Sequence, residues 1–204
     1  MHNAKAIAGI CLIRLEHIRP KFAPEFVGVN SENAAHRIAV LWEENGEMRE
    51  GVFIPRRDTN SFINSTVGGR IFPGEHHKAD FTVEDSGEID FAMQSKDKTV
   101  TVELKGKISE TLPEASVFSS LSEASDFFET GSLGYSVTKD ARHLDGIVLQ
   151  TKEWKVDALE LDSVHSSFYE DESIFPKGSI EFDHALIMQN ITHEWHSAPN
   201  FDLT

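Results

Sequence analysis

The chain has 204 residues, of which 39% are hydrophobic and 26% charged, a composition typical of a globular protein with one sizeable core. Its 34 acidic and 19 basic residues give a net charge of −15, and no basic run offsets it, so nucleic acids and anionic membranes would be repelled. No stretch reaches the ~18 apolar residues of a membrane helix. We expect one domain over residues 1–204, without nucleic-acid or membrane partners.

The start of the chain and its cysteine content bear on the compartment. A short apolar run, Ile7–Ile13, is followed by Arg14 and Glu16, which disfavours a signal peptide. The single cysteine, Cys11, excludes an internal disulfide and any multi-cysteine metal site, so the cytoplasm is the simplest expectation. Within its apolar run, Cys11 is interpreted as a small core residue rather than a nucleophile.

The first predicted elements form a hairpin. Residues 36–42 and 48–54 have strand patterns and flank an Asn45-Gly46 turn signal. Residues 55–60 are predicted to be a polar connection, in which Asp58 or Thr59 caps a short helix over 61–67 that ends at Gly68-Gly69.

A three-stranded meander is predicted next, from alternation of apolar and polar residues over 77–84, 89–94 and 99–108. In its first strand Ala79 and Phe81 share the apolar face. His77 lies two residues before Ala79 and so shares that face, whereas Lys78 belongs to the polar face.

The second half is predicted to contain one helix over 120–131, with Ser122 as its cap and Gly131 as its end. Asp183 and His184, in the last predicted strand, are expected on opposite faces and so not to form a pair. The tail, residues 190–204, is polar, and the sequence leaves open whether it is loose. Trp195, within this tail, needs a surface to pack on. Further strands are predicted at 135–138, 146–150, 154–164 and 180–188.

Strands therefore outnumber helices. The expected fold class is α+β and strand-rich, with a large, mostly antiparallel or mixed sheet, curled or closed, that carries a few short helices.

Two segments resemble a known family. G51-V-F-I-P-R-R-D-T-N-S-F-I-N with G69-R-I-F-P-G-E-H-H-K-A-D-F, and V164-H-S-S-F-Y-E-D-E-S-I-F-P-K-G-S-I-E-F-D-H-A-L-I-M with I191-T-H-E-W, are similar to the acetoacetate decarboxylase-like superfamily, closest to its uncharacterised YqjF-like branch. The resemblance implies a cone-like, partly closed β-sheet with a central cavity, and a homo-oligomer.

Decarboxylases of this superfamily carry a G-R-x-x-x-G-x-P-K-K pattern, whose first lysine forms a Schiff base with a β-keto acid. Desolvation and a neighbouring cation activate that lysine as a nucleophile. Aligned without a gap, Gly69, Arg70 and Gly74 match, His77 falls on the nucleophile and Lys78 on its cationic neighbour. An imidazole cannot form the imine. A slip by one residue would make Lys78 the nucleophile, but strand alternation turns Lys78 away from the apolar face.

Each candidate residue has a functional and a structural interpretation. His77 is a candidate acid or base or a core-edge histidine, and Lys78 a modulator of neighbouring groups or a solvated lysine. Arg70 is a carboxylate clamp or a salt-bridge partner of Glu75 or Asp80.

The other candidates are weaker. Glu75 and His76 would join His77 in a metal site only on an irregular backbone, so no metal is expected. Asn60 and Asn64 present amides to a ligand or act as turn and capping residues, and His76 is grouped with them as ligand-binding. In H193-E-W-H196 the histidines are three apart, so the pattern is not the H-E-x-x-H zinc motif.

These observations favour a cavity-bearing protein that binds a small carboxylate or keto acid. If it is an enzyme, it uses acid–base chemistry on a carbonyl compound, as a lyase, isomerase or hydratase, with His77, Lys78, Arg70 and Glu75 as the catalytic set and no cofactor. The alternative is a non-catalytic ligand-binding or structural oligomeric member of the fold.

Overall fold

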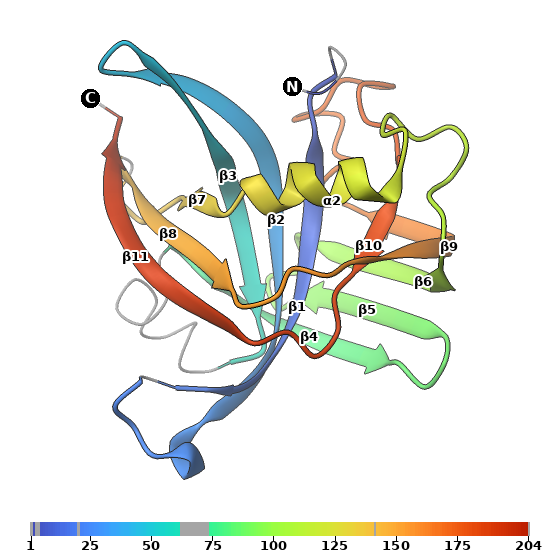
Figure 1. Ribbon diagram of the computed structural model, residues 1–204, viewed down its shortest axis with the longest axis horizontal. Helices are drawn as coiled ribbons and strands as arrows, with labels where there is room; N and C mark the ends of the chain where they lie inside the picture. The colour runs from blue at the N-terminus through green and yellow to red at the C-terminus, as the bar shows by residue number, and fades with distance from the viewer. Residues whose placement is uncertain (1, 3–4, 20, 62–73, 141, 204) are drawn as a thin grey trace. The chain divides into compact units, whose positions relative to one another are not determined.

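The structure, a computed structural model, describes residues 2, 5–19, 21–61, 74–140 and 142–203 (Figure 1). Strands dominate these residues, and α2 is the α-helix among them, which confirms the strand-rich prediction. The elements are β1 (Ala8–Ile18), the 3-10 helix η1 (Glu25–Val27), β2 (Val29–Glu44), β3 (Glu47–Thr59), β4 (His77–Glu84), β5 (Ile89–Ser95), β6 (Thr101–Ser109), α2 (Leu121–Thr130), β7 (Leu133–Ser136), β8 (His143–Thr151), β9 (Asp157–Ser166), β10 (Ala185–Ile187) and β11 (His193–Asp202).

The chain divides into two compact units that interleave along the sequence. Unit 1 comprises Met1–Ala79, Gly131–Leu149 and Trp195–Thr204. Unit 2 comprises Asp80–Thr130 and Gln150–Glu194.

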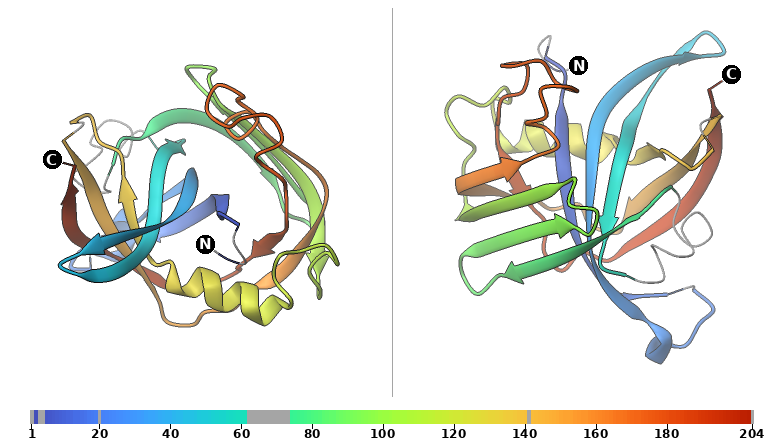
Figure 2. Two further views of the ribbon diagram at one scale, coloured as in Figure 1. Left: turned by 90° about the horizontal axis from the view of Figure 1, so that it is seen from above. Right: turned by 180° about the vertical axis from the view of Figure 1, so that it is seen from behind.

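The predicted hairpin forms the centre of unit 1. Strands β2 and β3 pair antiparallel up to Glu44 and Glu47, and Figure 2 shows them as one strongly curved ribbon. Asn45 and Gly46 both have positive φ, 53° and 82°, as a two-residue hairpin turn requires. The Asn45-Gly46 prediction is therefore confirmed.

Residues 55–60 are not the connection that the sequence predicts, because β3 continues to Thr59. Its polar residues remain in the sheet because they find partners there. Arg56 pairs with Asp58, and Thr59 Oγ1 donates to Asn33 Oδ1 at 2.8 Å. The helix predicted over 61–67 lies, apart from Ser61, outside the described part of the chain.

The sheet of unit 1 is mixed. Strand β1, which the sequence did not predict, pairs antiparallel with β2. The other edge of β3 is shared by two parallel neighbours, β7 at Val52–Ile54 and β4 at Asp58 and Thr59. The hydrogen-bonded order continues from β7 through β8 to β11. The tail, whose order the sequence leaves open, therefore forms the strand β11.

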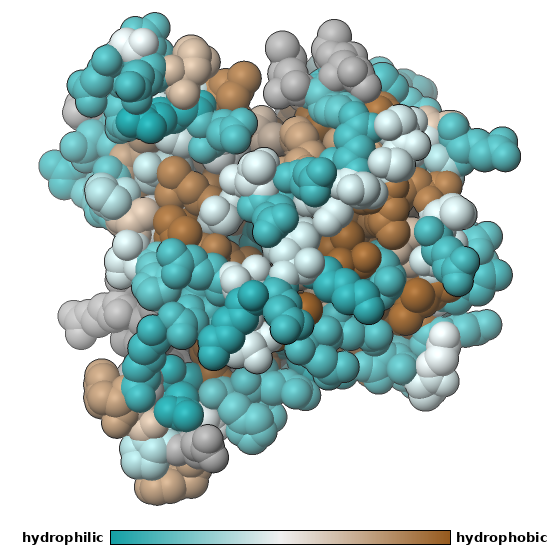
Figure 3. All heavy atoms as spheres, in the orientation of Figure 1, coloured by the Kyte–Doolittle hydropathy of each residue, from teal (hydrophilic) through white to brown (hydrophobic). Residues whose placement is uncertain are grey.

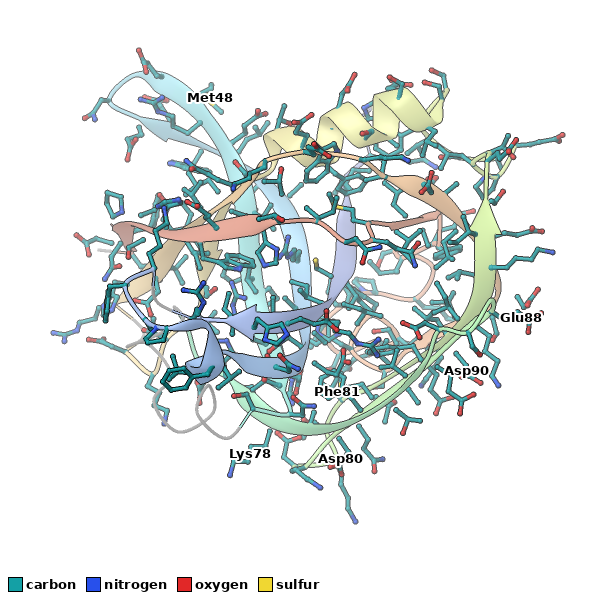
Figure 4. All side chains as sticks on the ribbon, turned by 60° about the horizontal axis from the view of Figure 1, so that its bottom comes forward. Met48, Lys78, Asp80, Phe81, Glu88 and Asp90 are labelled. Carbon is teal, nitrogen blue, oxygen red and sulfur yellow. The ribbon has the colours of Figure 1, made fainter. Side chains whose placement is uncertain are left out.

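The predicted meander forms as β4, β5 and β6 in sequence order, followed by β9 and β10; β4 begins in unit 1, and the rest of this series belongs to unit 2. Alternation in β4 is as predicted: Ala79 is buried, Lys78 and Asp80 are exposed, and Figure 4 shows Phe81 on the side of the strand opposite to Lys78 and Asp80. The buried apolar side chains of the unit include Phe91, Met93, Val100, Val102, Phe118, Ala124, Ala158 and Leu159.

Two local predictions in unit 2 are wrong. Ser120, not Ser122, caps α2, since Ser120 Oγ accepts the Glu123 N–H at 3.1 Å. The strand predicted over 180–188 is limited to β10, so Asp183 and His184 precede it on irregular backbone. Freed from strand alternation, Asp183 Oδ2 lies 2.6 Å from His184 Nδ1, and the two form the pair that alternation argues against.

Among the described residues, no helix combines the length and the apolar character needed to cross a membrane.

Candidate functional site

The centre of unit 1 buries several polar side chains. Buried polar groups require hydrogen-bond partners, and buried charges require counter-charges. The partners of each buried group therefore show whether any group lacks a hydrogen bond or a counter-charge. The buried polar residues of this unit are Ser31, His36, Arg57, Asp58, Thr59 and Ser136.

Arg56 and Asp58 satisfy each other. Arg56 Nε and Nη2 each donate to one carboxylate oxygen of Asp58, both at 2.9 Å, with the Asp58 side chain fully buried. Such a two-point pairing is the strongest arrangement for these groups. The Asp58 charge is therefore already used by Arg56.

Arg57, the next residue along β3, has no such carboxylate partner among the described residues. Its Nε donates to Ser136 Oγ at 2.9 Å, but its Nη2 is buried without a hydrogen-bond partner among the described residues. Burial, with the charge of Arg37, lowers the pKa of Arg57 to about 9, opposed by the thiol of Cys11. The guanidinium is thus cationic at neutral pH, and no carboxylate of the described residues is among the groups that shift its pKa.

A tight contact with Gly74 fixes the position of Ser136, the hydrogen-bond partner of Arg57. Gly74 has φ of +89°, and a Cβ built on it would lie 2.4 Å from Ser136 Cβ, so only glycine fits. The Gly74 N–H donates to Asp145 Oδ2 at 2.8 Å, and the Glu75 N–H donates to the Val137 carbonyl at 2.9 Å. The start of the 74–78 segment is thereby held against β7, beside Arg57.

His76 is electrostatically coupled to Arg57. Burial lowers the pKa of His76 to about 4, with a further contribution from Arg57, so the ring is neutral at neutral pH. Its Nδ1 lies 3.2 Å from the Gly74 carbonyl, which can only accept a hydrogen bond. The proton of the neutral ring therefore resides on Nδ1, and Nε2 carries a lone pair.

His36, fully buried on β2, is a second neutral imidazole. Burial, followed by the charge of Arg56, lowers the pKa of His36 to about 4. In the sheet it is aligned with Arg56, whereas its neighbour Ala35 is aligned with Arg57. His36 and Arg57 therefore belong to opposite faces of the same two strands.

The structure places the histidine and lysine that the sequence singles out at the start of β4. His77 is half-buried and aligned with Asp58, and Lys78 is exposed and aligned with Thr59. The imidazole whose environment includes Arg57 is thus His76. The sequence pattern groups His76 with ligand binding and favours His77 for catalysis.

The remaining candidates are dispersed. Glu75 is half-buried next to His76. Asn60 is exposed, and its Oδ1 accepts the Glu32 N–H at 2.9 Å, a structural role at the end of the β2–β3 ladder. Arg70 and Asn64 lie outside the described residues.

Sequence reasoning missed Arg57, Ser136 and Asp145. One signal was available for Arg57: in R56-R57-D58 two cations accompany one anion, so one guanidinium lacks a local partner. Nothing in the sequence marks Ser136 or Asp145, because their roles depend on contacts 79 and 71 positions away in the chain.

Unit 2 carries two histidine–carboxylate groups of its own. Asp183 Oδ2 accepts from Ser116 Oγ at 2.7 Å and lies against His184, whose ring packs on Phe118. His165 Nδ1 lies 2.9 Å from Glu170 Oε1, on an exposed part of the sheet. Over the described ranges, no three His, Cys, Asp or Glu side chains converge as metal ligands.

No known family model matches this chain, and no curated protein matches it.

Proposed function

We propose that the protein binds a small carboxylate or keto acid through the buried guanidinium of Arg57. The observation that carries the proposal is the Nη2 of Arg57, which is buried without a hydrogen-bond partner among the described residues. A buried cation without a counter-charge is unfavourable by several kcal/mol, on the order of 3–5 kcal/mol when a partner is removed from a buried pair. An anion bound at Arg57 would relieve that cost.

A carboxylate suits the geometry better than a point-charge anion. The Nε of Arg57 donates to Ser136, and Nη2 is the buried donor of this guanidinium that has no acceptor among the described residues. A planar carboxylate oxygen matches a guanidinium donor in direction and charge. The nearby imidazole of His76 is neutral, so a second hydrogen-bonding group is available without a second buried charge.

Any catalysis at this site would be acid–base chemistry on a carbonyl compound. His76 Nε2 or the His77 ring would accept or donate the proton, and Arg57 would hold the carboxylate. Schiff-base chemistry is not part of the proposal, because the resemblance aligns His77 with the nucleophile and because Lys78 is exposed. A solvated lysine lacks the desolvation that activates such an amine.

The acetoacetate decarboxylase-like fold, with its cone-like sheet and cavity, remains part of the proposal. The mixed, strand-rich sheet of unit 1 and the residues of the 69–81 segment support it. The family resemblance includes Gly74. The close approach of Gly74 to Ser136 explains why a glycine is needed at that position.

Isothermal titration calorimetry with pyruvate, acetoacetate and acetate tests the binding function. We expect Arg57→Gln to weaken binding at least tenfold. Arg49→Gln is the matched control, since Arg49 is an exposed arginine on the same strand. Arg57→Lys keeps the charge without the planar fork and should bind at an intermediate level. Unchanged affinity in folded Arg57→Gln would refute the proposal.

The non-catalytic alternative uses the same site. It is favoured if bound pyruvate or acetoacetate is released unchanged, as followed by NMR with deuterium exchange at the carbon next to the carbonyl. Exchange that disappears in both His76→Gln and His77→Gln would instead establish acid–base chemistry.

A homo-oligomer is also proposed, with the β1–β2 loop as its contact. Phe22 and Phe26 are 92% and 88% exposed at the tip of this loop, where Figure 3 shows apolar atoms gathered. Arg19 and Lys21 add positive charge to a loop on a chain whose net charge is −15. The acidic surface of a second copy therefore complements it.

Analytical ultracentrifugation of the Phe22→Ser/Phe26→Ser double variant tests this contact. The variant should sediment as a smaller species than the wild type, with unchanged unfolding temperature. The same sedimentation coefficient for both proteins would exclude the loop as an oligomer contact. Leu41→Ser, at an exposed residue of β2, is the matched control.

A further inference from the structure

Cys11 lies in the same row of side chains as Arg57. In the antiparallel register Cys11 is aligned with Ala35, and Ala35 is aligned with Arg57. Residues aligned across antiparallel strands project from the same face of the sheet. The thiol and the guanidinium therefore share a face, and the residue between them is an alanine with a single methyl group.

The composition of this row leaves space and positive charge next to the thiol. Arg37, two residues from Ala35, is on the same face and is aligned with Gly9, which has no side chain. Arg57 is itself nine-tenths buried, and its Nη2 has no partner within the described ranges. Cys11 and Arg57 are close enough for their charges to interact.

Cys11 is also accessible. It is half-buried on β1, whose pairing in unit 1 is with β2. The sequence pattern alone favours a small core residue at this position. The residues aligned with it on the neighbouring strands, Ala35 and Arg57, are both buried. The thiol is therefore partly exposed to solvent and lies in the same row as a buried cation.

We propose that Cys11 and Arg57 together form a modification site for small carboxylates that carry an electrophilic carbon. Arg57 holds the carboxylate, and the Cys11 sulfur attacks the adjacent carbon. This inference rests on the proposed carboxylate-binding function and adds a nucleophile and a ligand class to it. Thiols attack electrophilic carbon as thiolates, and the cation of Arg57 orients the carboxylate of the reagent.

The step balances for both relevant kinds of electrophile. With iodoacetate the thiolate forms a C–S bond, the C–I bond breaks, iodide leaves with the bonding electrons, and the thiol proton passes to solvent. With a 2-oxo acid the sulfur adds to the carbonyl carbon, the π electrons move to the carbonyl oxygen, and that oxygen takes up the proton. Neither step requires an oxidant or a reductant.

Paired alkylation with iodoacetate and the neutral iodoacetamide tests the inference. Both second-order rate constants are measured by intact mass, on native protein and on protein unfolded in urea. Cys11 is the only cysteine in the chain, so the adduct that Cys11→Ser lacks reports on it. We expect the iodoacetate-to-iodoacetamide ratio to be at least tenfold higher in the native protein, and acetate to slow iodoacetate selectively.

Variants identify the source of the selectivity. Arg57→Gln should abolish the native preference, whereas Arg49→Gln should retain it. Equal ratios in native and unfolded protein, or no native reaction with either reagent, would overturn the inference. Acetate protection is measured on the wild type alone. If Arg57→Gln does not fold, the slowing of iodoacetate alkylation by acetate still tests the inference.

The outcome is separable from that of the proposed function. If calorimetry shows Arg57-dependent binding of acetate while the alkylation ratio is unchanged, carboxylate binding stands and the role of Cys11 is refuted. If acetate neither binds nor protects and iodoacetate has no preference, both are refuted. Cys11→Ser should lose the fast adduct at residue 11 and still bind acetate.

Discussion

Arg57 Nε donates a 2.9 Å hydrogen bond to Ser136 Oγ, across 79 positions of the sequence. The contact joins the end of β3 to β7, and it holds one edge of this buried guanidinium. It fixes the direction in which the rest of the guanidinium points. Ser136 is therefore a positioning residue for the proposed carboxylate site.

Ser136→Ala should lower both stability and carboxylate affinity. Loss of the hydroxyl leaves Arg57 Nε buried without its acceptor, which costs about 1–3 kcal/mol in the free energy of unfolding. Urea denaturation and calorimetry with acetate measure the two effects. Ser132→Ala is the control, since Ser132 is exposed just before β7. Equal stability of the two variants would contradict the role of Ser136.

Gly74→Ala should destabilise the protein more than Gly46→Ala. Both glycines have positive φ, +89° and +82°, so both variants incur the same backbone strain. Only Gly74 has a close neighbour, Ser136 Cβ at 2.4 Å from the added methyl position, whereas nothing lies within 4 Å at Gly46. The steric difference should be about 1–3 kcal/mol in urea denaturation. Equal losses would show that Ser136 moves freely.

Stability should decrease as the pH falls from about 6.5 to about 4. The folded pKa values of His36 and His76 are both lowered from 6.5 to about 4, so the unfolded chain binds more protons within this window. The stability due to the neutral rings is fully present above pH 6.5 and is lost toward pH 4. Each histidine should account for up to about 3 kcal/mol.

The measurement is the unfolding free energy against pH for the wild type and His36→Gln. The variant should show a shallower slope between pH 6.5 and 4. His17→Asn provides the control, because His17 is exposed and Asn tolerates its φ of 53°. A slope that persists in full after His36→Gln and His76→Gln would assign the pH dependence to other groups.

Asp183→Asn should loosen the segment before α2. The Asp183 carboxylate accepts from Ser116 Oγ and from the Val117 N–H, at 2.7 and 2.8 Å. Partial burial disfavours its charge, yet these hydrogen bonds and the one to His184 together lower the pKa of Asp183. Hydrogen exchange of the Val117 amide should accelerate at least tenfold. Asp162→Asn, at an exposed residue of β9, should leave that rate unchanged.

Strand periodicity was enough to predict β4 and the hairpin. In β4 the alternation from His77 to Glu84 reproduces the observed burial, and Asn45-Gly46 specifies a turn whose two residues both need positive φ. These features depend on neighbours within a few positions. They can therefore be inferred from the sequence alone.

The end of β3 could not be predicted in the same way. Residues 56–59 are polar, and isolated polar runs are typical of connections. Thr59 and Arg57 remain in the sheet because Asn33 and Ser136 supply partners 26 and 79 positions away. Such partners are invisible to a pattern of period 2.

Composition, periodicity and turn signals were enough to predict the strand-rich class, the hairpin and the meander, because each depends on neighbours along the chain. Which of the two arginines of β3 keeps a carboxylate partner depends on the fold. Local charge balance leaves Arg56 and Arg57 equivalent, because one Asp58 serves either. Folding pairs Asp58 with Arg56 and buries Arg57 against a serine, so Arg57 is the desolvated cation on which the proposed anion site rests.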